Sequence, residues 1–222
     1  MKGTEKRTLK EWIIRSVILI IGLIIAHFGV TLFLLSDLGS DPFNVLVQGI
    51  TRKLNDSTGF SFLTHGRVHM SVCILIMLIL LITDRSYVKI GTIICMFCGG
   101  PIIDFFTLLL GHTASHFTSI PSRVVMVAAG CIILAYGMTI VIKSDAGTGP
   151  NDLVAVVISD KLNKKFSITR LIADAVFTLA GFLMGGTVGI GTAIAVILVG
   201  PVAGLFLPVN GKMVDHIIDR SA

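Results

Sequence analysis

The chain alternates long apolar runs with short polar segments. Three runs, 13–35, 88–110 and 124–142, are long enough to cross a bilayer, which takes roughly 20 helical residues. Three more, 68–83, 171–186 and 192–209, are shorter but nearly uncharged. Two weaker segments, 43–54 and 151–162, each follow a proline. This pattern predicts about six full membrane spans and two short helices.

The first part of this pattern recurs in the second part. The segment from Gly22 to Pro42 aligns without gaps with the segment from Gly130 to Pro150, 108 residues further along. Both segments end in Ser-Asp-x-Gly-(Ser/Thr)-x-Pro, and the Gly-Thr and Gly-Pro pairs at 91–92 and 100–101 recur at 191–192 and 200–201. Apolar composition alone would not repeat these motifs in order. We therefore predict one membrane domain, 1–222, with repeats at about 13–110 and 123–208.

The predicted fold is an all-α integral membrane protein of two homologous four-helix halves, each with one short helix after a Gly/Pro turn. Proline suits a first helical turn, and glycine allows backbone conformations closed to other residues. The short helices either cross the membrane, which makes the halves parallel, or re-enter, which makes them inverted. The equivalent loops, within 52–67 and 161–170, are both basic, which places both in the cytoplasm and favours parallel halves. Against this, 12–14 helical residues reach only about 20 Å.

Composition supports the membrane assignment. The chain is 54% hydrophobic and 14% charged, against about 25% charged in soluble proteins. The net charge of +5 comes from residues between apolar runs, so nucleic acid is not an expected partner. The Cys95-x-x-Cys98 pair lies mid-span without a second ligand pair and is assigned to packing. We expect no metal and no cofactor. The N-terminal apolar run is too long for a cleaved signal peptide and is taken as the first span.

The twin stretches at 39–42 and 147–150, with 189–192 followed by Gly200-Pro201, resemble the bacterial YczE/YyaS/YitT group of integral membrane proteins. The resemblance runs from about residue 13 to 208. It is greatest to the short YczE-like members, because no soluble domain is expected after the last span. It implies a multipass protein of the bacterial cytoplasmic membrane, and a permease role is commonly supposed for such proteins. From the positions of the basic residues, both termini are expected in the cytoplasm.

The twin turns supply the first candidate substrate-binding residues. Broken helices near a pseudo-symmetry axis expose N–H groups and carbonyls, from which many transporters build their sites. The alternative is that the acidic residues cap the short helices. The two turns diverge at two aligned positions, so a site made from both would be asymmetric. The candidates are Asp37, Gly39, Asp41, Pro42 and Asn44 in turn one, and Asp145, Gly147, Pro150, Asn151 and Asp152 in turn two.

Charged residues on the spans supply the others. Arg170 and Asp174 stand four residues apart at the head of a span and share a helix face. Arg67 aligns with Arg170, and Asp104 lies inside an otherwise apolar span. A charge within a span is costly unless it is paired or hydrated, which makes it a functional candidate. The alternatives are headgroup anchoring for the arginines and a near-surface position for Asp104. His27 and His69 are assigned to packing.

These features favour a transporter or permease for a small polar or amphipathic solute, with a site between the two halves. The alternatives are a non-transporting scaffold or regulatory factor and, third, a membrane enzyme acting on lipid. The sequence has no metalloprotease, triad or nucleotide-loop motif, so we do not expect an enzyme. The expected partners are the bilayer and a solute whose identity stays open, as does a homo-oligomer.

Overall fold

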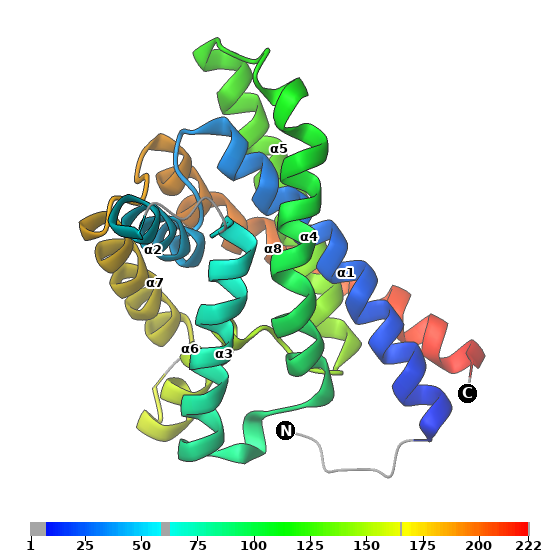
Figure 1. Ribbon diagram of the computed structural model, residues 1–222. Coiled ribbons are helices and arrows are strands. Elements are labelled where there is room, and N and C mark those ends of the chain that lie inside the picture. Colours follow the sequence, from blue (N-terminus) through cyan, green and yellow to red (C-terminus); the bar gives the residue numbers. More distant parts are fainter. Residues whose placement is uncertain (1–7, 59–62, 165, 222) are drawn as a thin grey trace.

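The protein is built from α-helices throughout the residues that the computed structural model describes, 8–58, 63–164 and 166–221 (Figure 1). This confirms the predicted fold class. The helices are α1 (Leu9–Ser36), α2 (Pro42–Thr58), α3 (His65–Thr83), α4 (Ile90–Ala114), α5 (Ile120–Ser144), α6 (Pro150–Leu162), α7 (Phe166–Leu183) and α8 (Ile190–Ser221), with a 3-10 turn, η1 (Arg85–Tyr87), between α3 and α4.

Six of these helices coincide with the six predicted spans. Within the described residues, α1, α3, α4, α5 and α8 are long and apolar enough to cross a membrane, and α7 contains the shorter apolar segment Leu171–Leu183. The remaining two, α2 and α6, begin at Pro42 and Pro150 and have 17 and 13 residues. The two short helices therefore start at the two predicted turns.

The centre of the molecule is a close pair of helices, α1 and α5, which cross in opposite directions (Figure 1). Gly22 packs against Gly137, and Gly29 packs against Gly130 and Leu134. A Cβ added to Gly29 would lie 2.6 Å from the backbone nitrogen of Leu134, so only glycine permits this approach. As the residue numbers rise along α1 they fall along α5, so the pair is antiparallel.

The contacts of α4 and α3 show which way the first four helices cross. α4 runs parallel to α1, because Leu19 of α1 meets Gly91 and His27 meets Gly99. α3 runs antiparallel to α4, because Gly66 meets Gly100 near the start of α3 and Met77 packs with Met96 further along. Hence α1 and α3 cross in opposite directions, and α2, which lies between them in the chain, does not cross.

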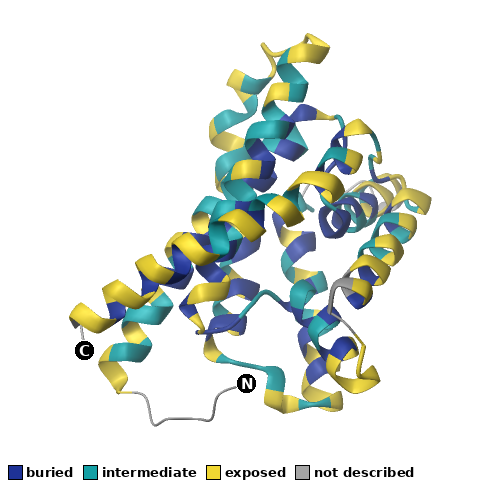
Figure 2. Cartoon of the chain, turned by 180° about the vertical axis from the view of Figure 1, so that it is seen from behind, coloured by how far each residue is buried: buried dark blue, intermediate teal, exposed yellow. Residues whose placement is uncertain are grey.

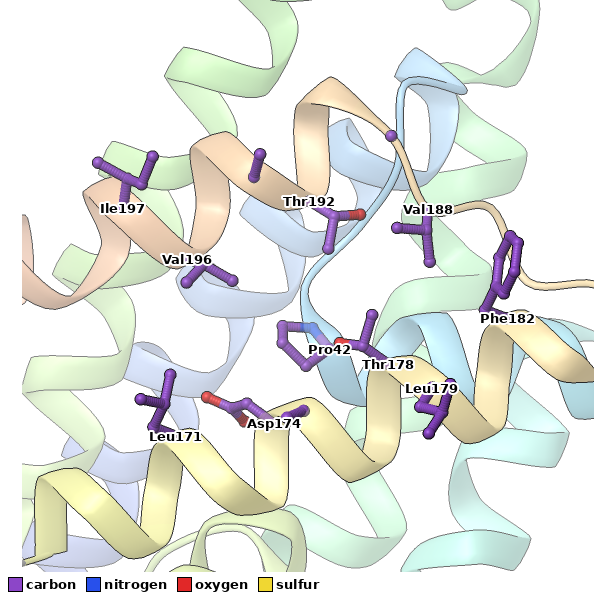
Figure 3. Close-up of a pocket in the computed structure, with 13 residues that line it drawn as sticks. Pro42, Leu171, Asp174, Thr178, Leu179, Phe182, Val188, Thr192, Val196 and Ile197 are labelled. Atoms are coloured by element: carbon purple, nitrogen blue, oxygen red, sulfur yellow. The ribbon is translucent and has the colours of Figure 1, made fainter.

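The second set of helices repeats this arrangement. α8 runs parallel to α5, because Ala195 packs with Val127 and Asn210 bonds to Thr139. α7 runs antiparallel to α8, since Leu171 faces the same cleft as Ile197, while Phe182 near the end of α7 lies close to the start of α8 (Figure 3). α6 therefore does not cross either.

The preference for parallel halves is consequently wrong. The equivalent spans α1 and α5 are antiparallel, so the two sets of helices have opposite orientations. The basic loops misled the interpretation because some of their charges have protein partners. The guanidinium of Arg52 donates to the carbonyl of Gly185 and to Oγ1 of Thr187, each at 2.8 Å, and so fixes the α7–α8 loop.

Aligned positions exchange contacts across the molecule. The amide of Gly191 donates to the carbonyl of Leu38 at 2.7 Å, and the amide of Gly91 donates to the carbonyl of Ala146 at 3.0 Å. Each turn thus bonds to the Gly-Thr pair of the other set of helices. Reciprocal contacts of this kind are typical of a two-fold-related interface.

The start of α1 and the end of α8 lie on the same side of the molecule, since Ile18 packs with Val214 and Ile218. Figure 2 shows the exposed residues on the outward faces of the helices and the buried ones along the inner contacts. Large apolar side chains such as Ile82 and Leu108 are 86% and 85% exposed. An apolar outer surface is what a bilayer requires.

Candidate functional site

The two motif turns have the same backbone geometry. Asp37 and Asp145 end α1 and α5 in the left-handed conformation, with φ of 52° and 51°. Gly39 and Gly147 follow with φ of 110° and 152°. A glycine is needed at both, because a Cβ would also lie 2.5 Å from an atom of the facing Gly-Thr segment. The chain therefore breaks sharply, and α2 and α6 begin inside the molecule.

A cleft of about 660 Å³ opens between α7 and α8 beside turn one (Figure 3). Its walls are mainly apolar and include Leu171, Leu179 and Phe182 of α7 and Val196 and Ile197 of α8. Its volume is in the range of small-molecule sites. The polar groups on its lining are Asp174, Thr178 and Thr192, and Pro42 of turn one closes its inner end.

We call the line along which two neighbouring helices face each other a seam. The seam between α3 and α4, which corresponds to the α7–α8 cleft, is closed. Gly66 and Gly100 touch through their backbones. Next to them, Asp104 accepts hydrogen bonds from Thr64 Oγ1 at 2.5 Å and from the amide of Gly66 at 2.9 Å. On α8, the positions aligned with Gly100 and Asp104 are Gly200 and Gly204. Within the described chain no atom lies within 4 Å of a Cβ placed on either.

Behind turn one, a chain of polar groups enters the protein. The side-chain amide of Asn44 donates to Asp41 Oδ2 at 2.7 Å. Its Oδ1 lies 2.9 Å from Nε2 of His65 on α3. Asn44, the middle member of this carboxylate–amide–imidazole chain, is only 4% exposed, whereas Asp41 and His65 are half-buried.

Two more histidines extend this cluster. The ring centroids of His27 on α1 and His69 on α3 lie 5.7 Å apart, edge to face. Gly99 of α4 leaves room for them, since a Cβ there would be 2.8 Å from His27 Nε2. Sequence reasoning overlooked His65 and treated the other two as packing residues. The available signal was the i, i+4 spacing of His65 and His69, which puts both rings on one face.

The remaining candidates are dispersed. Asp37 is exposed, 3.9 Å from Arg52, and Asp145 pairs with Lys89 at 3.0 Å. Asp104 binds the start of α3, as described above. Asp37 and Asp145 therefore end the long helices α1 and α5 instead of capping the short helices, and Asp104 holds a helix start.

The turn-two candidates do not line the cleft. Pro150 is buried at the first position of α6, and Asn151 donates to Asp152 at 3.1 Å. Asp152 nevertheless lies near enough for its charge to act on His27.

Neither arginine candidate is placed at the cleft by a described side chain. Arg67 is exposed in the first turn of α3, where its amide donates to Thr64 Oγ1 at 3.2 Å. Arg170 belongs to α7, but its side chain lies outside the described part. The structure thus brings Pro42 and Asp174 together at the cleft and Asp41 and Asn44 together behind it.

Sequence comparison places this architecture in a family. A family model described as "Family of unknown function (DUF6198)" matches residues 13–208, nearly the whole chain. The chain belongs to the DUF6198 family.

Relatives of this DUF6198 protein include two from Bacillus subtilis (strain 168). The "Uncharacterized membrane protein YczE" is 26% identical over 95% of the chain and 94% of the relative, and the "Uncharacterized protein YyaS" is 26% identical over 85% and 90%. An "Uncharacterized protein" of Haemophilus influenzae is 28% identical over 90% and 86%. No solved structure matches the chain. The expected resemblance to YczE and YyaS is confirmed, and with it the assignment as a membrane protein.

Proposed function

We propose that this protein is a permease that carries a small amphipathic solute across a bacterial cytoplasmic membrane, with its termini in the cytoplasm, and that it is not an enzyme. The observation that carries the proposal is the cleft between α7 and α8. It joins apolar walls to one carboxylate, and it ends at the broken helix of turn one. Sites of this composition suit solutes with an apolar body and a polar or cationic group.

The inverted arrangement of the helices supports this proposal. Turn one packs on the start of α8 and turn two on the start of α4, and α1 and α5 form the glycine-packed centre. Many carriers consist of inverted repeats whose substrate site lies beside discontinuous helices. Here we interpret the repeats at about 13–110 and 123–208 as such a pair.

The difference between the two seams supplies the mechanism. The α3–α4 seam is closed by Gly66, Gly100 and Asp104, whereas the aligned Gly200 and Gly204 face open space. In the carrier cycle α7 closes onto α8 while α3 separates from α4. Exchange of the open seam between the inverted halves presents the solute to opposite sides of the membrane in turn.

The first experiment identifies a solute. A panel of amphipathic amines, acids and zwitterions is screened for thermal stabilisation of the purified protein, because a ligand that binds the native state raises its apparent stability. A stabilising solute is then tested for uptake into proteoliposomes. Uptake above that of protein-free liposomes supports the proposal, and its absence for every stabilising solute contradicts it.

The cleft assignment is tested by Asp174→Asn. We expect uptake at low solute concentration to fall about tenfold or more, because the solute loses its contact with a charge inside a span. A tenfold fall corresponds to a lost binding free energy of about 1.4 kcal/mol. The matched control is Ser71→Ala, at the aligned position on α3, which lies outside the cleft. Equal uptake by both variants and the unmodified protein would remove Asp174 from the site.

A further inference from the structure

A cluster of three histidines, of which His69 is buried and His27 and His65 are half-buried, offers a second site, distinct from the cleft. His27 comes from α1 and His65 and His69 from α3. The rings of His27 and His69 meet where Gly99 of α4 leaves space, and His65, one helical turn before His69, lies against Asn44. Histidine is the side chain whose charge changes most readily near neutral pH. Three of them inside a membrane domain are costly to keep unless they have a function.

Hydrogen bonding assigns the proton-accepting atoms. Asn44 uses its NH₂ group to donate to Asp41, so its Oδ1 is the acceptor that faces His65. Nε2 of His65 therefore carries a hydrogen, and the lone pair of the neutral ring is on Nδ1. Nδ1 of His27 lies 2.9 Å from the carbonyl of Leu23 and must donate to it. The lone pair of His27 is thus on Nε2, the atom that faces Gly99 and the interior of the cluster.

Charged and titratable groups approach the cluster from several elements. Asp152 at the start of α6 acts electrostatically on His27, on Cys73 and on Cys95. The facing groups are Asp41 before α2, Cys73 of α3, Cys95 and Asp104 of α4, and Asp152 of α6.

A row of aromatic contacts links the cluster to the cleft. His69 stacks edge to face on Phe43 at 5.3 Å between centroids, and Phe43 does the same with Phe177 at 5.6 Å. Phe177 is on α7, between Asp174 and Thr178, which both line the cleft. Phe43 follows Pro42, another residue of the cleft lining. A change in the position of His69 therefore reaches both the inner end and one wall of the cleft.

We propose that the imidazoles of His27, His65 and His69 form a proton-binding site that couples the carrier cycle to the proton gradient. This inference rests on the proposed function. The proton comes from water on one side of the membrane, forms an N–H bond on His65 Nδ1 or His27 Nε2, and returns to water on the other side. Because an imidazolium is costly in this apolar interior, proton uptake favours an arrangement in which water or Asp152 reaches the ring.

The test measures the width of the cleft against pH. Spin labels are attached to Leu179→Cys on α7 and Ile197→Cys on α8, in a full-length variant without the four native cysteines, and their distance distribution is measured at pH 8 and pH 5.5. We expect a shift with pH in this background. We expect no shift in His27→Gln/His65→Gln/His69→Gln, because glutamine cannot bind the proton.

The matched control is His112→Gln/His116→Gln, a ring pair at 5.3 Å near the end of α4 and outside the cluster. This variant is expected to keep the shift. A distribution that is the same at both pH values in the labelled parent, or a shift that survives the triple substitution, would overturn the proposal.

A second measurement needs no triple variant. Histidine NMR signals of the unmodified protein in nanodiscs are assigned by their loss in single His→Gln variants. At least one signal from the cluster should titrate between pH 5.5 and 8, and titration of none of the three would overturn the proposal.

Failure of the two proposals is distinguishable. Uptake of a solute that is identical with and without a pH gradient removes only the coupling, whereas a pH-dependent cleft without uptake of any solute removes only the permease function.

Discussion

Asp104 shows how a single charge within a span is stabilised. Its carboxylate accepts from Thr64 Oγ1 and from the amide of Gly66, at the start of α3. The sequence marked this acid only as a costly charge within a span, and the partner that stabilises it is the start of a helix 40 residues away. A negative charge at a helix N-terminus is favourable, because the first N–H groups have no partner within the helix.

Replacing this carboxylate should destabilise the protein. In Asp104→Asn the side chain loses its charge and one acceptor, so we expect a loss of about 1–2 kcal/mol in unfolding free energy. The measurement is the thermal unfolding midpoint in detergent. Asp37→Asn is the control, since Asp37 is exposed and its nearest cation is 3.9 Å away. A midpoint for Asp104→Asn as high as that of the control would mean that the α3 contact contributes little.

Three glycines in different surroundings can be compared by the stability that each loses on substitution by alanine. Gly111→Ala adds a methyl group in open space on a helix and should be neutral or slightly stabilising. Gly185→Ala also has open space but a φ of 92°, so it should cost about 1–2 kcal/mol. Gly39→Ala combines a φ of 110° with a contact of 2.5 Å to Thr192 and should cost more than either.

Thermal unfolding of the three purified variants gives this order directly. If Gly39→Ala unfolds at the same temperature as Gly185→Ala, crowding at turn one contributes nothing beyond the backbone conformation.

At the scale of helices, small residues determine which pairs of helices can pack closely. Glycines allow α1 to touch α5 and α3 to touch α4, and the sequence shows where these glycines are. It did not indicate which seams are closed. Gly100 and Gly200 occupy aligned positions, yet only Gly100 is in contact, because its environment depends on α3, a separate segment of chain.

Closure of the second seam is open to test with Gly204→Leu. A side chain at Gly204 meets no described atom within 4 Å, so the observed arrangement should keep its stability. The added leucine side chain should block the approach of α7 to α8, and uptake into proteoliposomes should fall by about tenfold or more. Gly111→Leu, which adds the same group away from the seam, is the matched control. Transport by Gly204→Leu at the control rate would contradict closure of α7 onto α8.

The orientation of the whole molecule follows from the directions of its helices. With α2 and α6 not crossing, the α4–α5 loop lies on the side opposite to the termini. Eight crossing helices in two parallel halves would put that loop and the termini on the same side. The sequence favoured the second arrangement, because the two equivalent loops within 52–67 and 161–170 are both basic and were both attributed to the cytoplasm.

Cysteine labelling separates these two arrangements. Ser115→Cys, in the exposed α4–α5 loop, should react with an impermeant maleimide in right-side-out vesicles. Asp219→Cys, exposed near the end of α8, should react only after permeabilisation. The unmodified protein gives the background, since three of its cysteines are buried and Cys98 is half-buried. Labelling of both positions from the same side would contradict the inverted arrangement.

The sequence by itself determined the class of the protein, its spans and the places where helices break. These features are local, because the bilayer demands apolar runs and a left-handed backbone favours glycine. Only the tertiary structure decided that α1 and α5 are antiparallel, that Asp104 holds α3, that three histidines meet, and that one seam is open while the other is closed. Each of these depends on contacts between segments far apart in the chain, which no local pattern of residues specifies.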